Sequence, residues 1–159
     1  MNSWKSCITT CFGLGLLPKA PGTWGSLGAL FFWAALAQLT TGWLVYGTVL
    51  LAILALGTWA THLEGGEDRQ SIVVDEWVGM GIALSTGTFS WPELIVGFAL
   101  FRFFDIVKPL GIRCIDQKVK GAWGVMLDDV LAGIYSAIVL GFLVYLGVFN
   151  GFLASWQSY

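Results

Sequence analysis

The sequence predicts an all-α membrane protein, a polytopic helix bundle with about five transmembrane helices. Of its 159 residues, 57% are apolar and only 11% are charged, and the mean hydropathy is +0.77. A soluble domain carries about a quarter charged residues, so a soluble fold of this size could not bury so much apolar surface. Because each crossing takes about 20 residues, we expect one membrane domain over residues 1–159.

Five apolar runs are long enough to cross or nearly cross a bilayer. They cover residues 22–40, 43–61, 72–89, 92–110 and 124–149. The third run carries Asp75 and Glu76 near its start, so it is the one that could cross incompletely or begin in water. Tryptophans lie near the run ends, where an indole prefers the membrane interface: Trp24, Trp43, Trp59, Trp91 and Trp123.

The charges indicate how these helices are oriented. Residues 40–42, 85–91 and 150–159 contain no charge, whereas all eight basic residues fall before the first run, between the second and third, or from the end of the fourth to the fifth. The positive-inside rule makes that second side cytoplasmic. The sequence therefore predicts an odd number of crossings, with the N-terminus inside and the C-terminus outside. Lys5 precedes a broken, Gly-rich stretch without a cleavage site, so no cleaved signal peptide is expected.

Composition also excludes some classes of protein. A net charge of −2 provides no field for binding nucleic acid, and no feature of the sequence identifies a protein partner. The three cysteines, Cys7, Cys11 and Cys114, fit neither a redox pair nor a zinc pattern. We expect them to be reduced thiols near the cytoplasmic side.

Ionisable residues in or beside spanning helices are costly, so they are candidates for function. Here they are Asp75, Glu76, Arg102, Asp105, Lys108, Asp128 and Asp129. Small residues follow two of the acids at helical spacings of four: Gly79 and Ala83 after Asp75, and Gly133, Ala137 and Gly141 after Asp129. Small residues let membrane helices approach closely, so both carboxylates should lie above packing seams and face the bundle interior.

Arg102, Asp105 and Lys108 step by three along the fourth helix, which places one acid between two bases. A set of ion pairs that only fixes the bundle is the structural alternative. However, five carboxylates face two bases, which leaves three acids in excess. Hard oxygen ligands in excess suit Mg²⁺, held by Asp75, Glu76, Asp105, Asp128 and Asp129. Arg102 and Lys108 are then free to hold phosphate oxygens, and the combination favours phosphoryl chemistry.

Other polar residues have simpler interpretations. Residues 21–26 (PGTWGS) form a turn and a helix cap, which is the favoured interpretation, or Thr23 and Ser26 contact a phosphate. His62 is expected in a loop or at the interface, because hard cations favour oxygen. The acids expected to be ordinary solvated or interfacial groups are Glu64, Glu67, Glu93 and Asp116, while Asp68 is intermediate because it lies seven residues before Asp75.

Three covalent or aspartyl routes to phosphate hydrolysis are disfavoured. No cysteine is followed by arginine at the spacing of a thiol phosphatase loop, and a single histidine does not fit a histidine-nucleophile lipid phosphatase. An Asp-x-Asp motif, typical of aspartyl-phosphate hydrolases, is absent.

Five segments together resemble the phosphatidylglycerophosphatase A family. They are FGLG at 12–15, PGTWGSL at 21–27, IVVDEWVG at 72–79, FRFFDIVKP at 101–109 and GVMLDDVLAG at 124–133. The resemblance covers about residues 12 to 136 in order, and the combination is highly specific although no single segment is.

This resemblance implies a bacterial inner-membrane, Mg²⁺-dependent enzyme that removes the terminal phosphate of phosphatidylglycerophosphate to give phosphatidylglycerol. The positions that match the family pattern are Asp75, Glu76, Arg102, Asp105, Lys108, Asp128 and Asp129, with Asp68 less securely aligned. Such a phospholipid would meet the acidic cluster at the cytoplasmic interface, which agrees with the topology expected from charge.

The role of Asp105 stays open at this stage: it could orient the two bases, act as a general base to water, or form an aspartyl-phosphate, with direct attack by water slightly preferred. A different class of function is a small ion-coupled transporter with carboxylate cation sites, although such sites usually lie near the membrane midplane. Another is a structural subunit whose charges dock a partner helix.

Overall fold

The structure is a computed structural model that describes residues 4–39, 42–66, 69–109 and 111–150. Within these ranges all regular secondary structure is helical, which confirms the all-α prediction. The helices are α1 (Trp4–Thr9), the 3₁₀ helix η1 (Leu14–Leu16), α2 (Pro21–Leu39), α3 (Trp43–Leu63), α4 (Val74–Leu84), α5 (Trp91–Val107), α6 (Ile112–Lys118) and α7 (Ala122–Tyr145).

Each of the five apolar runs contains one helix, but the third run forms a shorter helix than its length suggests. Ile72 and Val73 are not helical, and α4 ends at Leu84, before the Ser-Thr-Gly-Thr stretch at 85–88. With 11 residues, α4 is about 16 Å long, roughly half the thickness of a bilayer core. Two short helices, α1 and α6, lie outside the predicted runs.

By length and composition, two of the described helices could cross a membrane. They are α3, with 21 residues, and α7, with 24. Together with the apolar surface of the bundle, these two helices indicate association with a membrane.

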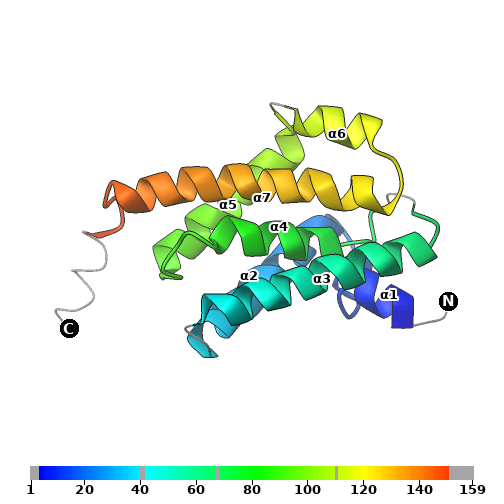
Figure 1. The fold of residues 1–159 in the computed structure, drawn as a ribbon, viewed down its shortest axis with the longest axis horizontal. Helices are drawn as coiled ribbons and strands as arrows, with labels where there is room; N and C mark the ends of the chain where they lie inside the picture. Colours follow the sequence, from blue (N-terminus) through cyan, green and yellow to red (C-terminus); the bar gives the residue numbers. More distant parts are fainter. Residues whose placement is uncertain (1–3, 40–41, 67–68, 110, 151–159) are drawn as a thin grey trace.

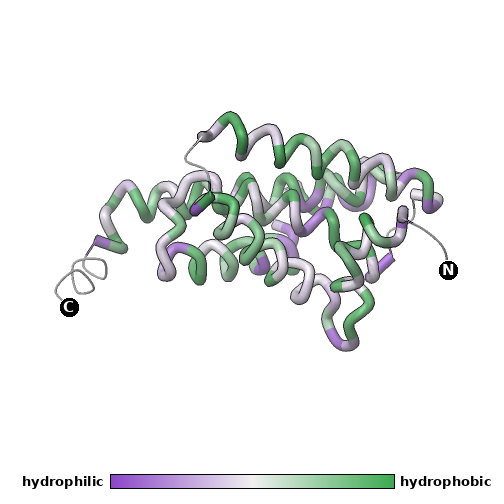
Figure 2. The backbone as a smooth tube through the Cα atoms, turned by 90° about the horizontal axis from the view of Figure 1, so that it is seen from below, coloured by the Kyte–Doolittle hydropathy of each residue, from purple (hydrophilic) through white to green (hydrophobic). Residues whose placement is uncertain are grey.

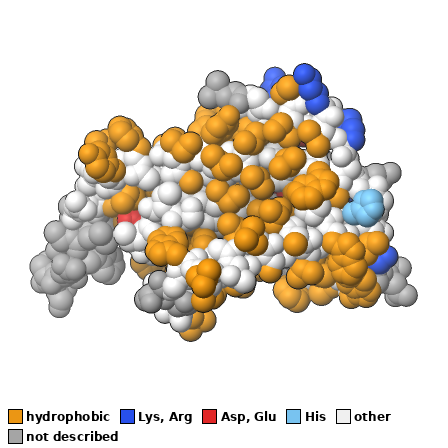
Figure 3. Space-filling model, viewed as in Figure 1, with side chains coloured by type: hydrophobic (Ala, Val, Ile, Leu, Met, Phe, Trp, Pro, Cys, Tyr) orange, Lys and Arg blue, Asp and Glu red, His pale blue; other side chains and the backbone are white. Residues whose placement is uncertain are grey.

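The two ends of the bundle differ in charge. The chain enters at α1, at one end, and α7 finishes at the opposite end (Figure 1). The eight Lys and Arg residues belong to α1, the chain before α2, the α3–α4 connection, the second half of α5 and the residue that follows it, α6 and the chain before α7. On the face drawn in Figure 3, Lys and Arg appear only toward the end where α1 and α6 lie, and hydrophilic segments are more numerous toward that end in Figure 2.

Helices α4 and α7 pack along the seam of small residues that the sequence predicts. A Cβ added to Gly133 would collide with the backbone oxygen of Gly79, and one added to Gly79 would lie 2.7 Å from the backbone oxygen of Asp129. Further along, Thr86 Oγ1 donates to the carbonyl of Ala137 at 2.9 Å. The two backbones therefore touch, and only glycine allows that approach.

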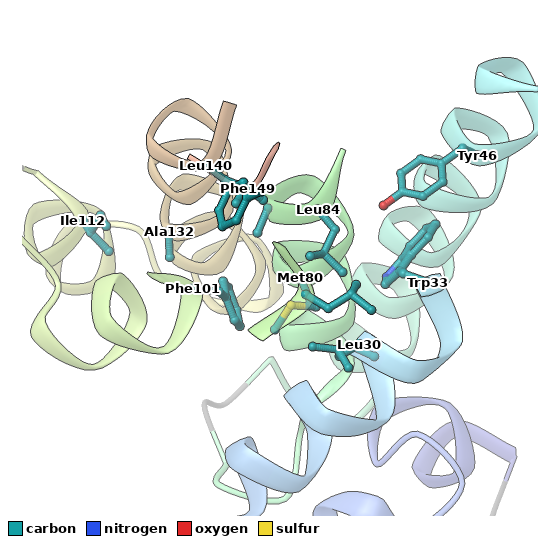
Figure 4. Close-up of a cluster of buried hydrophobic side chains, with 13 residues drawn as sticks. Leu30, Trp33, Tyr46, Met80, Leu84, Phe101, Ile112, Ala132, Leu140 and Phe149 are labelled. Atoms are coloured by element: carbon teal, nitrogen blue, oxygen red, sulfur yellow. The ribbon is translucent and has the colours of Figure 1, made fainter. Parts of the chain in front are cut away.

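The apolar core lies between α4 and its neighbours, around Trp33, Met80, Leu84, Phe101 and Leu140 (Figure 4). Two aromatic side chains also bond to the backbone of α4. Trp33 Nε1 donates to the carbonyl of Trp77 at 2.8 Å, and the Tyr46 hydroxyl donates to the carbonyl of Gly81 at 2.7 Å. The bond to Gly81 matters because Gly81 lies in the last turn of α4, where an apolar surrounding offers no water to the carbonyls. Helices α2 and α3 thus fix α4 in place, and with it Asp75 and Glu76.

Candidate active site

A cavity of about 360 Å³ opens at the end of the bundle that carries the basic residues. It lies between the first turn of α4, the C-terminal end of α5, the second turn of α7, the start of α2 and the chain before α4. Its lining residues are Ala20, Pro21, Gly22, Arg69, Gln70, Ile72, Asp75, Glu76, Asp105, Lys108, Asp128 and Asp129. Six of the seven residues expected to carry the chemistry therefore face one space, although they come from three helices.

Three carboxylates form the centre of this site. Asp75, Glu76 and Asp129 each offer one oxygen, and these oxygens lie within 4.8 Å of one another. Among the residues that the structure describes, none of the three forms an ion pair. Glu76 and Asp129 are buried, and Glu76 Oε2 has no hydrogen-bond partner. Three unneutralised carboxylates at this separation repel one another, so the arrangement is suited to a cation.

Lys108 bridges two further acids. It follows the last residue of α5 in a left-handed conformation, and its Nζ lies 2.6 Å from Asp128 Oδ2 and 2.8 Å from Asp116 Oδ1. Burial acts to lower the pKa of Lys108, but the hydrogen bonds and negative charges of the two carboxylates outweigh it and raise the pKa above its ordinary value. Lys108 is therefore a fixed cation in the cavity wall, and its third N–H remains available to an anion.

Arg102 lies behind the cavity rather than in its lining. Its Nη1 donates to Asp105 Oδ2 at 2.6 Å and to Ser26 Oγ at 3.3 Å, and its Nε is buried without a hydrogen-bond partner. A Cβ on Gly22 would lie 3.3 Å from the same Nη1 and would collide with Glu76 Oε1. The PGTWGS segment thus forms a close wall over Arg102 and Glu76.

Thr23 and Ser26, the two hydroxyl residues considered as phosphate contacts, have different surroundings. Ser26 is fully buried, and its Oγ donates to the carbonyl of Gly22 at 2.8 Å while it accepts from Arg102. This bond to a carbonyl four residues earlier is not the predicted cap, because a cap side chain accepts from free backbone amides, and residues 21–26 form the first turns of α2 rather than a turn before it. Ser26 also positions Arg102. Thr23 is partly buried, and neither it nor Ser26 belongs to the cavity lining.

A second cavity, of about 400 Å³, adjoins the first. The two share Asp75 and Asp128, which stand between them. The other lining residues come from the end of α6, the start of α7 and the chain between them, together with Gly66: Asp116, Val119, Lys120, Gly121, Gly124 and Val125.

Several residues differ from the sequence-based interpretation. Glu93 is not a solvated acid: it is 2% exposed, and it accepts from the backbone N–H and hydroxyl of Thr88. Asp116 is half-buried and paired with Lys108, so it belongs to the site network. Glu64 is partly buried and accepts from Ser6, Thr9 and Arg69.

Arg69, one of the eight basic residues that the sequence analysis uses for orientation, lines the first cavity. Its position could not follow from helix periodicity, because it lies in a connection. His62 is exposed in the last turn of α3, so it lies in a helix and not in a loop. Asp68 and Glu67 lie outside the described residues.

The three cysteines are free thiols, as predicted. Cys7 and Cys114 are exposed, whereas Cys11 is buried beneath the start of α4. Burial, with a smaller contribution from the charges of Asp75 and Glu76, raises the pKa of the Cys11 thiol. Cys11 is therefore an inert packing residue.

The fold and site together define a class: an all-helical, membrane-associated protein with clustered carboxylates beside fixed cations. The model of the family described as Phosphatidylglycerophosphatase A matches residues 7–144. This chain therefore belongs to the phosphatidylglycerophosphatase A family.

Relatives from three bacteria are similar over most of their length. The chain is 39% identical to phosphatidylglycerophosphatase A of Escherichia coli K12, over 89% of this chain and 84% of that protein. It is 42% identical to the Haemophilus influenzae protein of the same name, over 81% and 82%. It is also 46% identical, over 84% and 89%, to a Bacteroides thetaiotaomicron protein whose provisional name is phosphatidylinositol-3-phosphatase. No solved structure matches the chain.

Proposed function

We propose that this protein is a Mg²⁺-dependent membrane enzyme that hydrolyses the terminal phosphomonoester of phosphatidylglycerophosphate and releases phosphatidylglycerol and phosphate. The observation that carries this proposal is the cluster of Asp75, Glu76 and Asp129, unpaired within the described residues, next to the fixed cation Lys108. Family membership and the names of two relatives supply the lipid substrate. A small ion-coupled transporter is not favoured by these similarities.

The donor set of the cluster fits a hard divalent cation. All of its donors are carboxylate oxygens, and Glu76 Oε2 is buried with no other partner. Asp75, Glu76 and Asp129 would hold Mg²⁺, with Asp128 and Asp105 close enough to the same cavity to bind it through water. When bound, Mg²⁺ supplies positive charge that stabilises the negative charge on the phosphoryl group during hydrolysis.

The protein's own cations hold the phosphate in this proposal. Lys108 lines the cavity and donates its free N–H to a phosphate oxygen, while Asp128 and Asp116 fix its position. Arg102 does not line the cavity, and it acts indirectly through its ion pair with Asp105 and its hydrogen bond to Ser26. Arg69 also lines the cavity, with an exposed side chain, and adds positive charge there.

Hydrolysis requires a water oxygen to bond to phosphorus while the bond from phosphorus to the glycerol oxygen breaks. The attacking water loses a proton, and the departing glycerol oxygen gains one. Asp105 lines the cavity with one oxygen bound to Arg102, and in this proposal its carboxylate accepts the proton from water. Direct attack by water is therefore our preferred route, and a phosphorylated Asp105 trapped during turnover would contradict it.

We further propose that the protein is a multi-pass protein of the bacterial cytoplasmic membrane, with its site on the cytoplasmic side. Helices α2, α3, α5 and α7 would cross the bilayer, and α4 with residues 85–90 would complete a fifth passage. The concentration of all eight basic residues toward one end supports this orientation.

The test is phosphate release from phosphatidylglycerophosphate by purified protein in detergent. Activity should require added Mg²⁺, disappear with a chelator, and fall by about 10²-fold or more in Asp129→Asn, which removes one carboxylate of the cluster. Lys118→Gln is the control, because Lys118 is exposed at the same end of the bundle, lines neither cavity and forms none of the ion pairs of the described residues. Activity that is indifferent to both the metal and Asp129 would refute the assigned site.

A further inference from the structure

The second cavity adjoins the site but is not needed to bind a phosphomonoester. It is about 400 Å³ in volume, slightly larger than the first, and meets it at Asp75 and Asp128. Because both cavities are lined by Asp75 and Asp128, we treat them as two compartments of one site. A headgroup that occupies both would pass directly beside the carboxylate cluster.

The second compartment has one cationic lining residue, Lys120. Its other charged lining residues are Asp75, Asp116 and Asp128, of which the last two share the single positive charge of Lys108. Lys120 is exposed and, among the residues that the structure describes, forms no ion pair. Its charge is therefore available to a bound anion.

The backbone around Lys120 also favours an anion. Gly121 is the N-cap of α7 and has a positive φ of 78°, a conformation that glycine adopts readily. Because Gly121 has no side chain, the first amides of this 24-residue helix receive no side-chain cap. The N-terminal end of a long helix carries partial positive charge, and here it borders the same cavity as Lys120.

We propose that the second compartment binds the phosphodiester of the lipid substrate while the first binds the phosphomonoester, so that Lys120 selects lipids that carry both groups. This inference rests on the proposed function, since the proposed substrate has two phosphates joined through a glycerol of three carbon atoms. Phosphatidic acid, whose only phosphate is a monoester attached directly to diacylglycerol, has no group for the second compartment. Lys120 is a specificity-determining residue in this arrangement and takes no part in breaking the bond.

The experiment compares two lipids in the same detergent micelles with Mg²⁺: phosphatidylglycerophosphate and phosphatidic acid. The variants are Lys120→Gln, Lys120→Arg and the control Lys118→Gln, which removes a nearby charge that lines neither cavity. In Lys120→Gln we expect KM for phosphatidylglycerophosphate to rise about 3- to 10-fold, as for loss of one solvent-accessible charged contact, with little change in kcat. The ratio of kcat/KM between the two lipids should fall by the same factor, recover in Lys120→Arg and stay unchanged in Lys118→Gln.

A second measurement uses inhibitors that each fill one compartment. Glycerophosphoglycerol has only the diester and should inhibit Lys120→Gln less well than the unsubstituted protein, whereas inorganic phosphate should inhibit both equally. Equal losses with both lipids, an unchanged inhibition by glycerophosphoglycerol, or the same result in Lys118→Gln would overturn the assignment of Lys120. No phosphate release from phosphatidylglycerophosphate by the unsubstituted protein would instead refute the proposed function, and this inference with it.

Discussion

Gly79 of α4 and Gly133 of α7 meet backbone to backbone, with no room for a Cβ on either residue. Asp75 lies four residues before Gly79, and Asp129 lies four residues before Gly133. Each carboxylate therefore projects one helical turn away from the same point of contact. The separation of the two helices at this contact sets the separation of the two acids in the cluster.

Gly133→Ala should separate α4 from α7 and so widen the carboxylate cluster. Because the added Cβ would meet backbone rather than a movable side chain, we expect a loss of about 1–3 kcal/mol in stability and a clear loss of activity. Thermal unfolding in detergent and Mg²⁺-stimulated phosphate release measure the two effects. Gly47→Ala is the control, since a Cβ there meets nothing within 4 Å. An active Gly133→Ala protein with normal Mg²⁺ response would mean that the seam does not set the site.

Gly22→Ala should disturb the site with much less effect on stability. The added methyl group would collide with Glu76 Oε1, the end of a flexible side chain that can rotate away. We expect about 10-fold more Mg²⁺ to be needed for half-maximal activity, because Glu76 would leave the cluster, while the unfolding temperature changes little. A shift in unfolding temperature as large as that of Gly133→Ala would show instead that Gly22 serves packing.

Lys108 provides a comparison between its two acidic partners. Asp128 lies between the two cavities, whereas Asp116 lines only the second and has a more exposed side chain, 34% against 11%. Asp128→Asn should therefore lower kcat by about 10²-fold, and Asp116→Asn by no more than about 3-fold, because Asp128 still holds Lys108. Steady-state kinetics on both variants tests this order, and equal losses would contradict it.

The seam and the carboxylate surplus could be predicted because both depend on local spacing. Small residues four positions apart lie on one face of a helix regardless of the rest of the fold. The excess of acids over bases can be counted from the sequence alone. The prediction of three excess acids corresponds to Asp75, Glu76 and Asp129, which form no ion pairs in the described structure. The sequence could not show which acids are paired, because pairing depends on contacts between helices. Asp116, for example, lies on a separate helix, α6, and pairs with Lys108.

The length of α4 and the environment of Glu93 depend on tertiary contacts. Hydropathy continues through residues 72–89, but the helix is confined to Val74–Leu84, and its carbonyls bond to Trp33 and Tyr46 of other helices. Glu93 appears at a helix start, where an acid is commonly solvated. Its burial follows from the return of residues 85–90 over it, which hydropathy does not encode.

Glu93→Gln should weaken the fold without changing the chemistry. Glu93 accepts bonds from both the backbone N–H and the hydroxyl of Thr88, in the first turn of α5 and so at the opposite end of that helix from Asp105 and Lys108. The amide keeps one acceptor but loses the charge, so we expect a loss of about 1–3 kcal/mol in stability. Thermal unfolding measures this loss, and kcat below the unfolding temperature should stay unchanged. A fall in kcat of the folded variant would contradict this expectation and would indicate that Glu93 affects the active site.

The native cysteines offer a test of the proposed orientation. Cys7 in α1 and Cys114 in α6 are exposed at the end of the bundle that carries the basic residues, whereas Cys11 is buried with a raised thiol pKa. A membrane-impermeant maleimide should therefore label no cysteine in intact cells, two in inverted membrane vesicles, and all three after denaturation. Cys7→Ser and Cys114→Ser each remove one of the two vesicle labels, which assigns them. Labelling of Cys7 or Cys114 from outside intact cells would reverse the orientation and place the site on the opposite face of the membrane.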